Sequence, residues 1–166
     1  MSHTLTLHPA PKRDAIFLWV LLSWLAFALL PGWSLDYGLL ESTRDEIIDA
    51  YGWSHVNVSW LWYLLPSVLL VRPLSETRRE QRGRHYFDAG WALLCMAFVA
   101  VSATVEGRGL GYAVIVLFVA LAAIMTLALT RLEWLGGDRF VIGSLIVIVA
   151  LIGVFIVWPS IAIFIP

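Results

Sequence analysis

Five long stretches without Asp, Glu, Lys, Arg or His constrain this chain more than any other feature of its sequence. Charged residues bound the stretches, which cover about residues 15–33, 56–71, 89–105, 110–130 and 140–160. The hydrocarbon core of a bilayer is about 30 Å thick, and roughly 20 helical residues cross it. A barrel strand would be much shorter and would alternate in polarity. The sequence therefore predicts an all-α, polytopic bundle of about five transmembrane helices.

The composition argues against a water-soluble fold. Hydrophobic residues make up 60% of the 166 residues and charged residues only 14%. Soluble domains are about half apolar and about a quarter charged. The net charge of −1 gives no indication of a nucleic-acid partner. The one cysteine, Cys95, lies in the third stretch and is interpreted as a small packing residue.

The first stretch resembles a secretory signal in having a basic start before an apolar run. No small-x-small cleavage site follows it, and it ends in the Pro-Gly-Trp run at 31–33. We interpret it as an uncleaved span that follows a cytoplasmic tail over residues 1–14. The membrane region then covers residues 15–166.

The second stretch is the shortest. Pro66 is predicted to kink its helix, because proline removes a backbone hydrogen bond. Three aromatic residues suit an interfacial belt: Trp60, Trp62 and Tyr63.

The basic residues set the predicted orientation. A cytoplasmic N-terminus leaves only Arg44 and Arg108 outside. The inside segments then hold Lys12, Arg13, Arg72, Arg78, Arg79, Arg82, Arg84, Arg131 and Arg139. This distribution agrees with the excess of Lys and Arg in cytoplasmic loops.

The last residues, 161–166, are apolar and carry no polar tail. Since five spans would put this end outside without anchoring residues, we expect the chain to be the front part of a longer protein.

The exterior loop over residues 34–57 contains the candidate site. We expect a short helix from about Thr43 to Tyr51, beginning at Ser42, on the membrane surface. Asp45 and Asp49 would share one face of it, and Glu46 and His55 lie near them in the sequence. One hypothesis is a cation-attracting entrance, since hard cations favour carboxylate oxygens. The favoured interpretation is a solvated helix face.

The interior loop over residues 72–88 is rich in arginine. Its arginines are expected to contact anionic headgroups, each contributing on the order of 1 kcal/mol near the surface. Docking of a cytoplasmic partner is the alternative. The segment from Arg131 to Arg139 is predicted to be a tight interior turn, with Trp134 at the interface.

Small residues recur at steps of seven, three and seven in the last three stretches. They are Gly90, Ala97, Ala100 and Gly107; Ala113, Ala120, Ala123 and Thr130; and Gly143, Ala150, Gly153 and Ser160. Small residues allow helices to approach closely in lipid. We therefore predict a packing seam between the third, fourth and fifth spans.

The sequence names no catalytic, cofactor-binding or metal-binding residue and no substrate path. It has no phosphate-binding loop with lysine and no Asp, Glu, Lys, Arg or His inside the predicted spans. These observations argue against nucleotide hydrolysis and against an intramembrane proton relay.

The run from Thr130 to Phe140, Thr-Arg-Leu-Glu-Trp-Leu-Gly-Gly-Asp-Arg-Phe, precedes a span that ends near Trp158-Pro159. Together with the earlier apolar stretches and the arginine-rich loop, it resembles the N-terminal part of large bacterial iron(III) ABC transporter permeases. The resemblance implies a multi-pass component of the bacterial inner membrane. It also implies a periplasmic binding protein, a cytoplasmic ATPase and further permease helices as partners. The Glu-Ala-Ala loop on which such ATPases dock is absent from this sequence.

Two other functional classes remain open. One is a small non-enzymatic membrane scaffold or assembly subunit, which would bind other membrane proteins. The other is a membrane enzyme with its active site at Asp45, Glu46 and Asp49. The predicted function remains the N-terminal portion of a permease, and not an enzyme.

Overall fold

A computed structural model of the protein describes residues 15–54, 59–70, 78–106 and 109–152. Within these ranges the backbone is helical apart from turns and two isolated β-bridges. The elements are α1 (Ala15–Leu29), α2 (Arg44–Ala50), α3 (Ser59–Ser67), η1 (Val68–Leu70), α4 (Arg78–Glu106), α5 (Tyr112–Arg131), η2 (Trp134–Gly137) and α6 (Arg139–Ile152). The predicted all-α fold class is confirmed.

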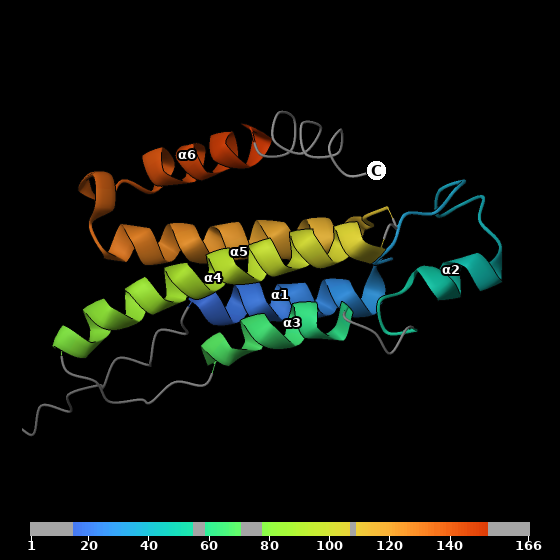
Figure 1. Ribbon diagram of the computed structural model, residues 1–166, viewed down its shortest axis with the longest axis horizontal. Coiled ribbons are helices and arrows are strands. Elements are labelled where there is room, and N and C mark those ends of the chain that lie inside the picture. The colour runs from blue at the N-terminus through green and yellow to red at the C-terminus, as the bar shows by residue number, and fades with distance from the viewer. Residues whose placement is uncertain (1–14, 55–58, 71–77, 107–108, 153–166) are drawn as a thin grey trace, which may run out of the picture.

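Helix α5 lies at the centre of the molecule. It packs against α1, α4 and α6, while α3 packs against α4 and α1 (Figure 1). Helix α2 stands apart, beyond the end of the bundle where α1 ends and α5 begins (Figure 1). Helix α6 therefore joins the bundle by packing on α5, and α2 protrudes from one end of the bundle.

Among the described residues, two helices are long and apolar enough to cross a bilayer by themselves, over Arg82–Val105 and Tyr112–Arg131. At about 1.5 Å per residue, the length of α5 matches a hydrocarbon core of about 30 Å. The shorter apolar helices are Ala15–Leu29, Ser59–Leu70 and Arg139–Ala150. Residues 153–160 of the fifth predicted span lie outside the described residues, and the number of spans stays a prediction.

Helix α4 begins well before the predicted start of the third span at residue 89. It starts at Arg78, so most of the predicted interior loop is helical. Arginine, glutamate and glutamine are good helix formers, and they extend the helix beyond its apolar part. The assignment of residues 78–88 to a loop was therefore wrong.

The predicted seam of small residues is also wrong for α4. Gly90, Ala97 and Ala100 are exposed on this helix. The face that packs into the bundle consists of Asp88, Ala92, Cys95, Val99 and Ala103, which recur at helical steps of three and four. Cys95 is 1% exposed, as expected of a packing residue.

The predicted seam of small residues agrees better with the packing of α5 and α6. Ala113 and Ala120 of α5 are buried. On α6, a Cβ added to Gly143 would lie 3.7 Å from Thr126 Cγ2 of α5, whereas Ala150 is exposed. Gly107, Gly153 and Ser160 lie outside the described residues.

Two aromatic residues of the second predicted span are inside the bundle and not at an interface. Trp62 and Tyr63 are each 1% exposed, and only Trp60 reaches the surface. Trp62 Nε1 donates a hydrogen bond of 2.6 Å to Ser102 Oγ of α4. The Ser102 hydroxyl on the neighbouring helix thus accepts a hydrogen bond from an indole N–H that would otherwise be buried without a partner.

Two further indoles bind the end of α3, where Pro66 is followed by the 3₁₀ turn η1. Trp24 Nε1 of α1 donates to Ser67 Oγ at 2.7 Å. Trp91 Nε1 of α4 donates to the carbonyl oxygen of Leu65 at 2.8 Å. The change from α to 3₁₀ helix agrees with the predicted kink, and the indoles hold it against both neighbours.

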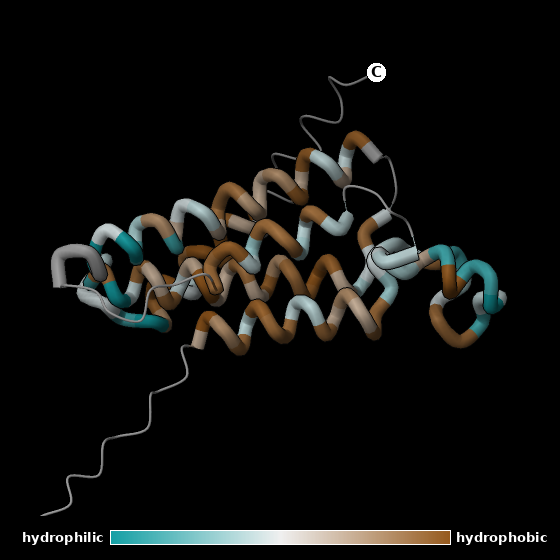
Figure 2. The backbone as a smooth tube through the Cα atoms, turned by 90° about the horizontal axis from the view of Figure 1, so that it is seen from below, coloured by the Kyte–Doolittle hydropathy of each residue, from teal (hydrophilic) through white to brown (hydrophobic). Residues whose placement is uncertain are grey.

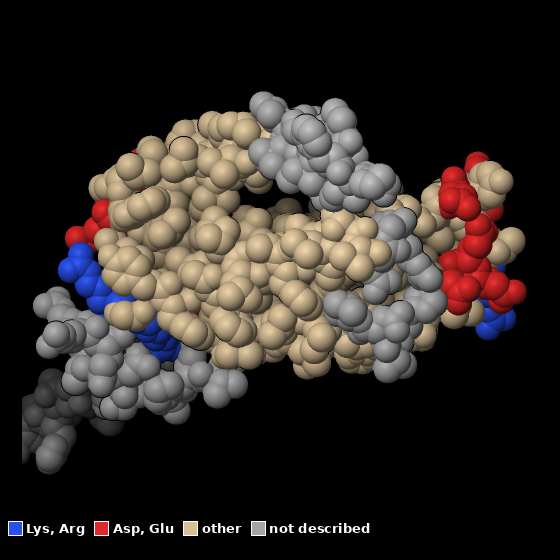
Figure 3. Space-filling model, in the orientation of Figure 1, with Lys and Arg blue, Asp and Glu red and all other residues tan. Residues whose placement is uncertain are grey.

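The surface between the two ends of the bundle is apolar. Exposed residues along it include Leu18, Leu21 and Leu25 of α1, Leu93, Leu94 and Val101 of α4, and Val147, Ile148 and Val149 of α6. Hydrophilic residues gather at the two ends of the tube in Figure 2. The visible charged side chains also lie at the two ends in Figure 3. This is the surface expected of a bundle whose middle is covered by lipid.

Candidate functional site at the acidic end

A backbone junction forms the floor of the acidic end. The amides of Gly32 and Trp33 both donate to the carbonyl oxygen of Ala50, at 2.7 and 3.0 Å. On the other side of the same segment, the Ser34 amide donates to Gly109 and the Gly111 amide donates to Gly32, each at 2.9 Å. The segment after α1 is therefore held between the end of α2 and the start of α5.

Glycine is required at position 111 of this junction. A Cβ there would lie 2.7 Å from both Gly32 C and Trp33 N, and also against the carbonyl oxygen of Pro31. These are backbone atoms, so they cannot turn away as a flexible side chain would.

Helix α2 begins with a capping box on Thr43 and Glu46. The Glu46 amide is bound by the Thr43 hydroxyl, and the Thr43 amide donates to Glu46 Oε2 at 3.0 Å. The predicted short helix is confirmed, but its cap is Thr43 and not Ser42. Threonine is followed three residues later by glutamate, as the motif requires, whereas serine is followed by aspartate.

The orientation of α2 also differs from the prediction. Its axis runs close to the long axis of the molecule, beyond the end of the bundle (Figure 1). In a bilayer crossed by this bundle, α2 would point away from the membrane surface and not lie flat on it. The junction sets this direction, because it holds Ala50 and Tyr51 against the segment that follows α1.

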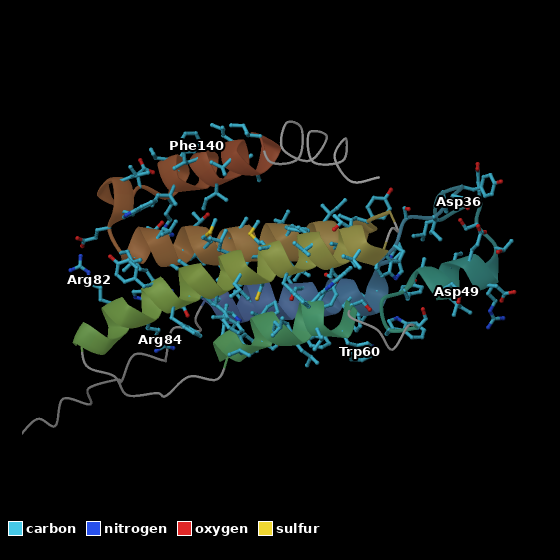
Figure 4. The ribbon with its side chains drawn as sticks, viewed as in Figure 1. Asp36, Asp49, Trp60, Arg82, Arg84 and Phe140 are labelled. Carbon is cyan, nitrogen blue, oxygen red and sulfur yellow. The ribbon has the colours of Figure 1, made fainter. Side chains whose placement is uncertain are left out.

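A cavity of about 480 Å³ lies between α2 and the junction. Four carboxylate residues line it, and none of its lining residues is basic. They are Asp36, Asp45, Glu46 and Asp49. Figure 4 shows Asp36 and Asp49 at this end, far from Arg82 and Arg84. The structure thus brings together Asp45, Glu46 and Asp49 as predicted and adds Asp36 from the preceding loop.

The cavity has acidic walls but no assembled set of metal ligands. Within the described residues, no three His, Cys, Asp or Glu side chains are grouped closely enough to hold a metal ion. Glu46 is already engaged in the capping box. His55 lies outside the described residues. Chemically, the arrangement can raise the local concentration of cations by its field, but it offers no preformed coordination sphere.

The sequence-based prediction missed a buried carboxylate, Asp88, beside the partly buried His85 at the other end. Asp88 of α4 is 1% exposed, and its Oδ2 lies 3.9 Å from Nδ1 of His85. Both residues had been assigned to the interior loop. Their spacing of three would have indicated a shared helix face once the loop was recognised as helical.

Two curated proteins are similar to most of this chain. The chain is 44% identical over 152 residues to the ferric transport system permease protein FbpB of Actinobacillus pleuropneumoniae, which covers 92% of this chain and 22% of that protein. It is 39% identical over 114 residues to the putative ferric transport system permease protein FbpB 1 of Haemophilus influenzae, covering 69% of this chain and 18% of that protein.

The chain thus spans about a fifth of the length of these curated relatives. No protein-family model matches the chain, and no solved structure matches it. The resemblance inferred from the run between Thr130 and Phe140 and from the preceding stretches is confirmed by one relative that matches 92% of the chain and another that matches 69%. The chain therefore resembles the N-terminal region of bacterial ferric transport system permeases.

Proposed function

We propose that this chain forms the leading membrane region of an ABC-type permease that imports ferric iron across the bacterial inner membrane. The observation that carries the proposal is the 44% identity to a ferric transport system permease over 92% of the chain. The apolar surface between two charged ends supports it, because such a bundle needs lipid around it.

In this proposal the bundle stabilises and positions the rest of the permease, while coupling to ATP hydrolysis takes place elsewhere. The chain carries no Glu-Ala-Ala loop for an ATPase. A cytoplasmic ATPase and a periplasmic binding protein would therefore engage the permease through its remaining four-fifths. The acidic cavity at α2 would then face the compartment from which iron arrives.

The proposed orientation has the basic end in the cytoplasm. Arg82 and Arg84 lie near the start of α4, Arg131 ends α5 and Arg139 begins α6. Arg44, by contrast, lies on α2 among acidic residues. An excess of arginine on one side is the usual mark of the cytoplasmic face. The alternative of a small membrane scaffold is not favoured by the relatives, which are permeases.

A chimera tests the proposal. The matching region of the A. pleuropneumoniae permease is replaced by this chain, and uptake of radioactive ferric iron is measured in cells that lack their own ferric permease. Uptake should be retained with this chain and lost when the region is deleted. As a control, an unrelated bundle of the same number of spans takes its place.

If the unrelated bundle restores uptake equally, the region acts only as a general membrane anchor. If the chimera inserts at normal levels but transports no iron, this chain is not equivalent to the permease region.

A further inference from the structure

A basic edge lies at the end of the bundle opposite to α2. Figure 3 shows arginine side chains as a blue band at the start of α4. The described arginines of this end belong to three helices: Arg82, Arg84, Arg131 and Arg139. Glu133 and Asp138 lie between α5 and α6 at the same end. The α4 side of this end is thus its most basic part.

Aromatic residues follow the arginines along α4. Tyr86 is 59% exposed and Phe87 is 51% exposed. The Phe87 ring stacks on Trp91 at a centroid distance of 5.7 Å and an angle of 17°. Amphipathic aromatic rings prefer the headgroup level of a bilayer. Their position indicates that the membrane boundary crosses α4 about one turn after Arg82.

Beyond the aromatic residues, the same face of α4 is open and apolar. Arg82, Tyr86, Gly90 and Leu93 share one face, since they are spaced by four, four and three. A Cβ added to Gly90 would meet no atom within 4 Å, and Leu93 is 57% exposed. No helix of the described bundle covers this face, which therefore contacts lipid if the chain spans the membrane.

The order of groups along this face is that of a phospholipid: Arg82 as a cation for the phosphate, the Tyr86 ring at the interface, and an open apolar track for an acyl chain. We propose that residues 82–94 of α4 bind an anionic phospholipid, with the headgroup at Arg82 and an acyl chain along Tyr86, Gly90 and Leu93. Arginine suits this role because its guanidinium matches phosphate oxygens in geometry and charge.

Arg84 lies on another side of α4, from which its charge adds to the electrostatic attraction of the anionic headgroup. The proposal rests on the membrane embedding of the chain but not on iron transport.

The test uses the full chain, purified in neutral detergent, into which phosphatidylglycerol or phosphatidylcholine is titrated. Bound lipid is counted by native mass spectrometry, and thermal midpoints are recorded in parallel. Phosphatidylglycerol should bind more tightly than phosphatidylcholine. Arg82→Gln should weaken its binding about fivefold, the factor expected for one basic residue near an anionic surface.

Arg84→Gln should have a smaller effect, and Arg44→Gln, at the opposite end, none. A Gly90→Trp variant, which fills the acyl track without changing charge, should lower retention of both lipids. An unchanged midpoint in detergent without added lipid establishes that each variant is folded.

Equal affinity for the two lipids in the wild-type chain would overturn the proposal, as would the same loss in Arg44→Gln. Binding of poly-glutamate in place of lipid at Arg82 would also overturn it and would indicate an acidic protein partner. Because no readout involves iron, lipid binding and a failed permease chimera are separate results.

Discussion

At the level of single residues, the backbone leaves no room for a side chain at Gly111, where the segment after α1 meets the start of α5. Gly111→Ala would bring a methyl group within 2.7 Å of two backbone atoms. We expect this substitution to lower the free energy of unfolding by about 1–3 kcal/mol, the usual cost of overpacking. Equilibrium unfolding in mixed detergent micelles measures the change.

Gly90→Ala is the matched control, because its Cβ would meet nothing within 4 Å. It should leave stability unchanged or raise it slightly, since alanine is the better helix former. Equal losses in the two variants would contradict the close approach at Gly111.

The hydrogen bond between Trp62 and Ser102 gives a second prediction for single residues. Trp62→Phe removes the donor of a bond of 2.6 Å between α3 and α4. In a double-mutant cycle with Ser102→Ala, we expect a coupling free energy of about 0.5–1.5 kcal/mol, typical of interhelical bonds in membranes.

The same cycle with Trp53→Phe in place of Trp62→Phe is the reference, because Trp53 is exposed and its ring stacks on Tyr51. It should show no coupling to Ser102. A coupling of zero for Trp62 would mean that the bond does not contribute to helix association.

At the level of elements, the face of α4 decides how the bundle packs. Ala92 is 0% exposed, whereas Ala97 is exposed on the opposite face. Ala92→Leu should therefore lower the free energy of unfolding by about 1–3 kcal/mol, because three extra carbons have no space between α4 and its neighbours.

Ala97→Leu adds the same volume to the surface and should change stability by less than about 0.5 kcal/mol. Unfolding of both variants in the same micelles checks the pair. A larger loss of stability in Ala97→Leu than in Ala92→Leu would support the packing seam predicted from the spacing of small residues.

At the level of the whole molecule, the charge distribution predicts the topology. In a Cys95→Ala background, a cysteine at Ser42→Cys reports on the acidic end, and one at Asp138→Cys reports on the basic end. In intact spheroplasts, a membrane-impermeant maleimide should label position 42 directly and position 138 only after lysis.

Labelling of position 138 in intact spheroplasts would show that the basic end faces outward, and labelling of both positions would rule out a bundle that spans the bilayer. A soluble periplasmic thiol protein and a cytoplasmic one serve as markers of membrane integrity.

The sequence by itself determined the helical class, the apolar middle, the two charged ends and the short helix α2. Each of these follows from local information: the length of an apolar run, the position of charges, or a hydroxyl residue three positions before an acidic one, although the cap proved to be Thr43 with Glu46 and not Ser42. The resemblance to ferric transport permeases also came from the sequence, through the run from Thr130 to Phe140 together with the earlier apolar stretches and the arginine-rich loop.

Only the tertiary structure decided which sides of the helices face inward. In water, an apolar face indicates the core, because the outside is polar. In lipid both sides of a helix are apolar, so periodicity alone could not tell the buried face of Ala92 from the exposed face of Ala97. Three further features depend on residues far apart in the chain, which only the packed helices bring together. They are the burial of Trp62, the close backbone approach at Gly111 and the position of Asp36 in the wall of the acidic cavity.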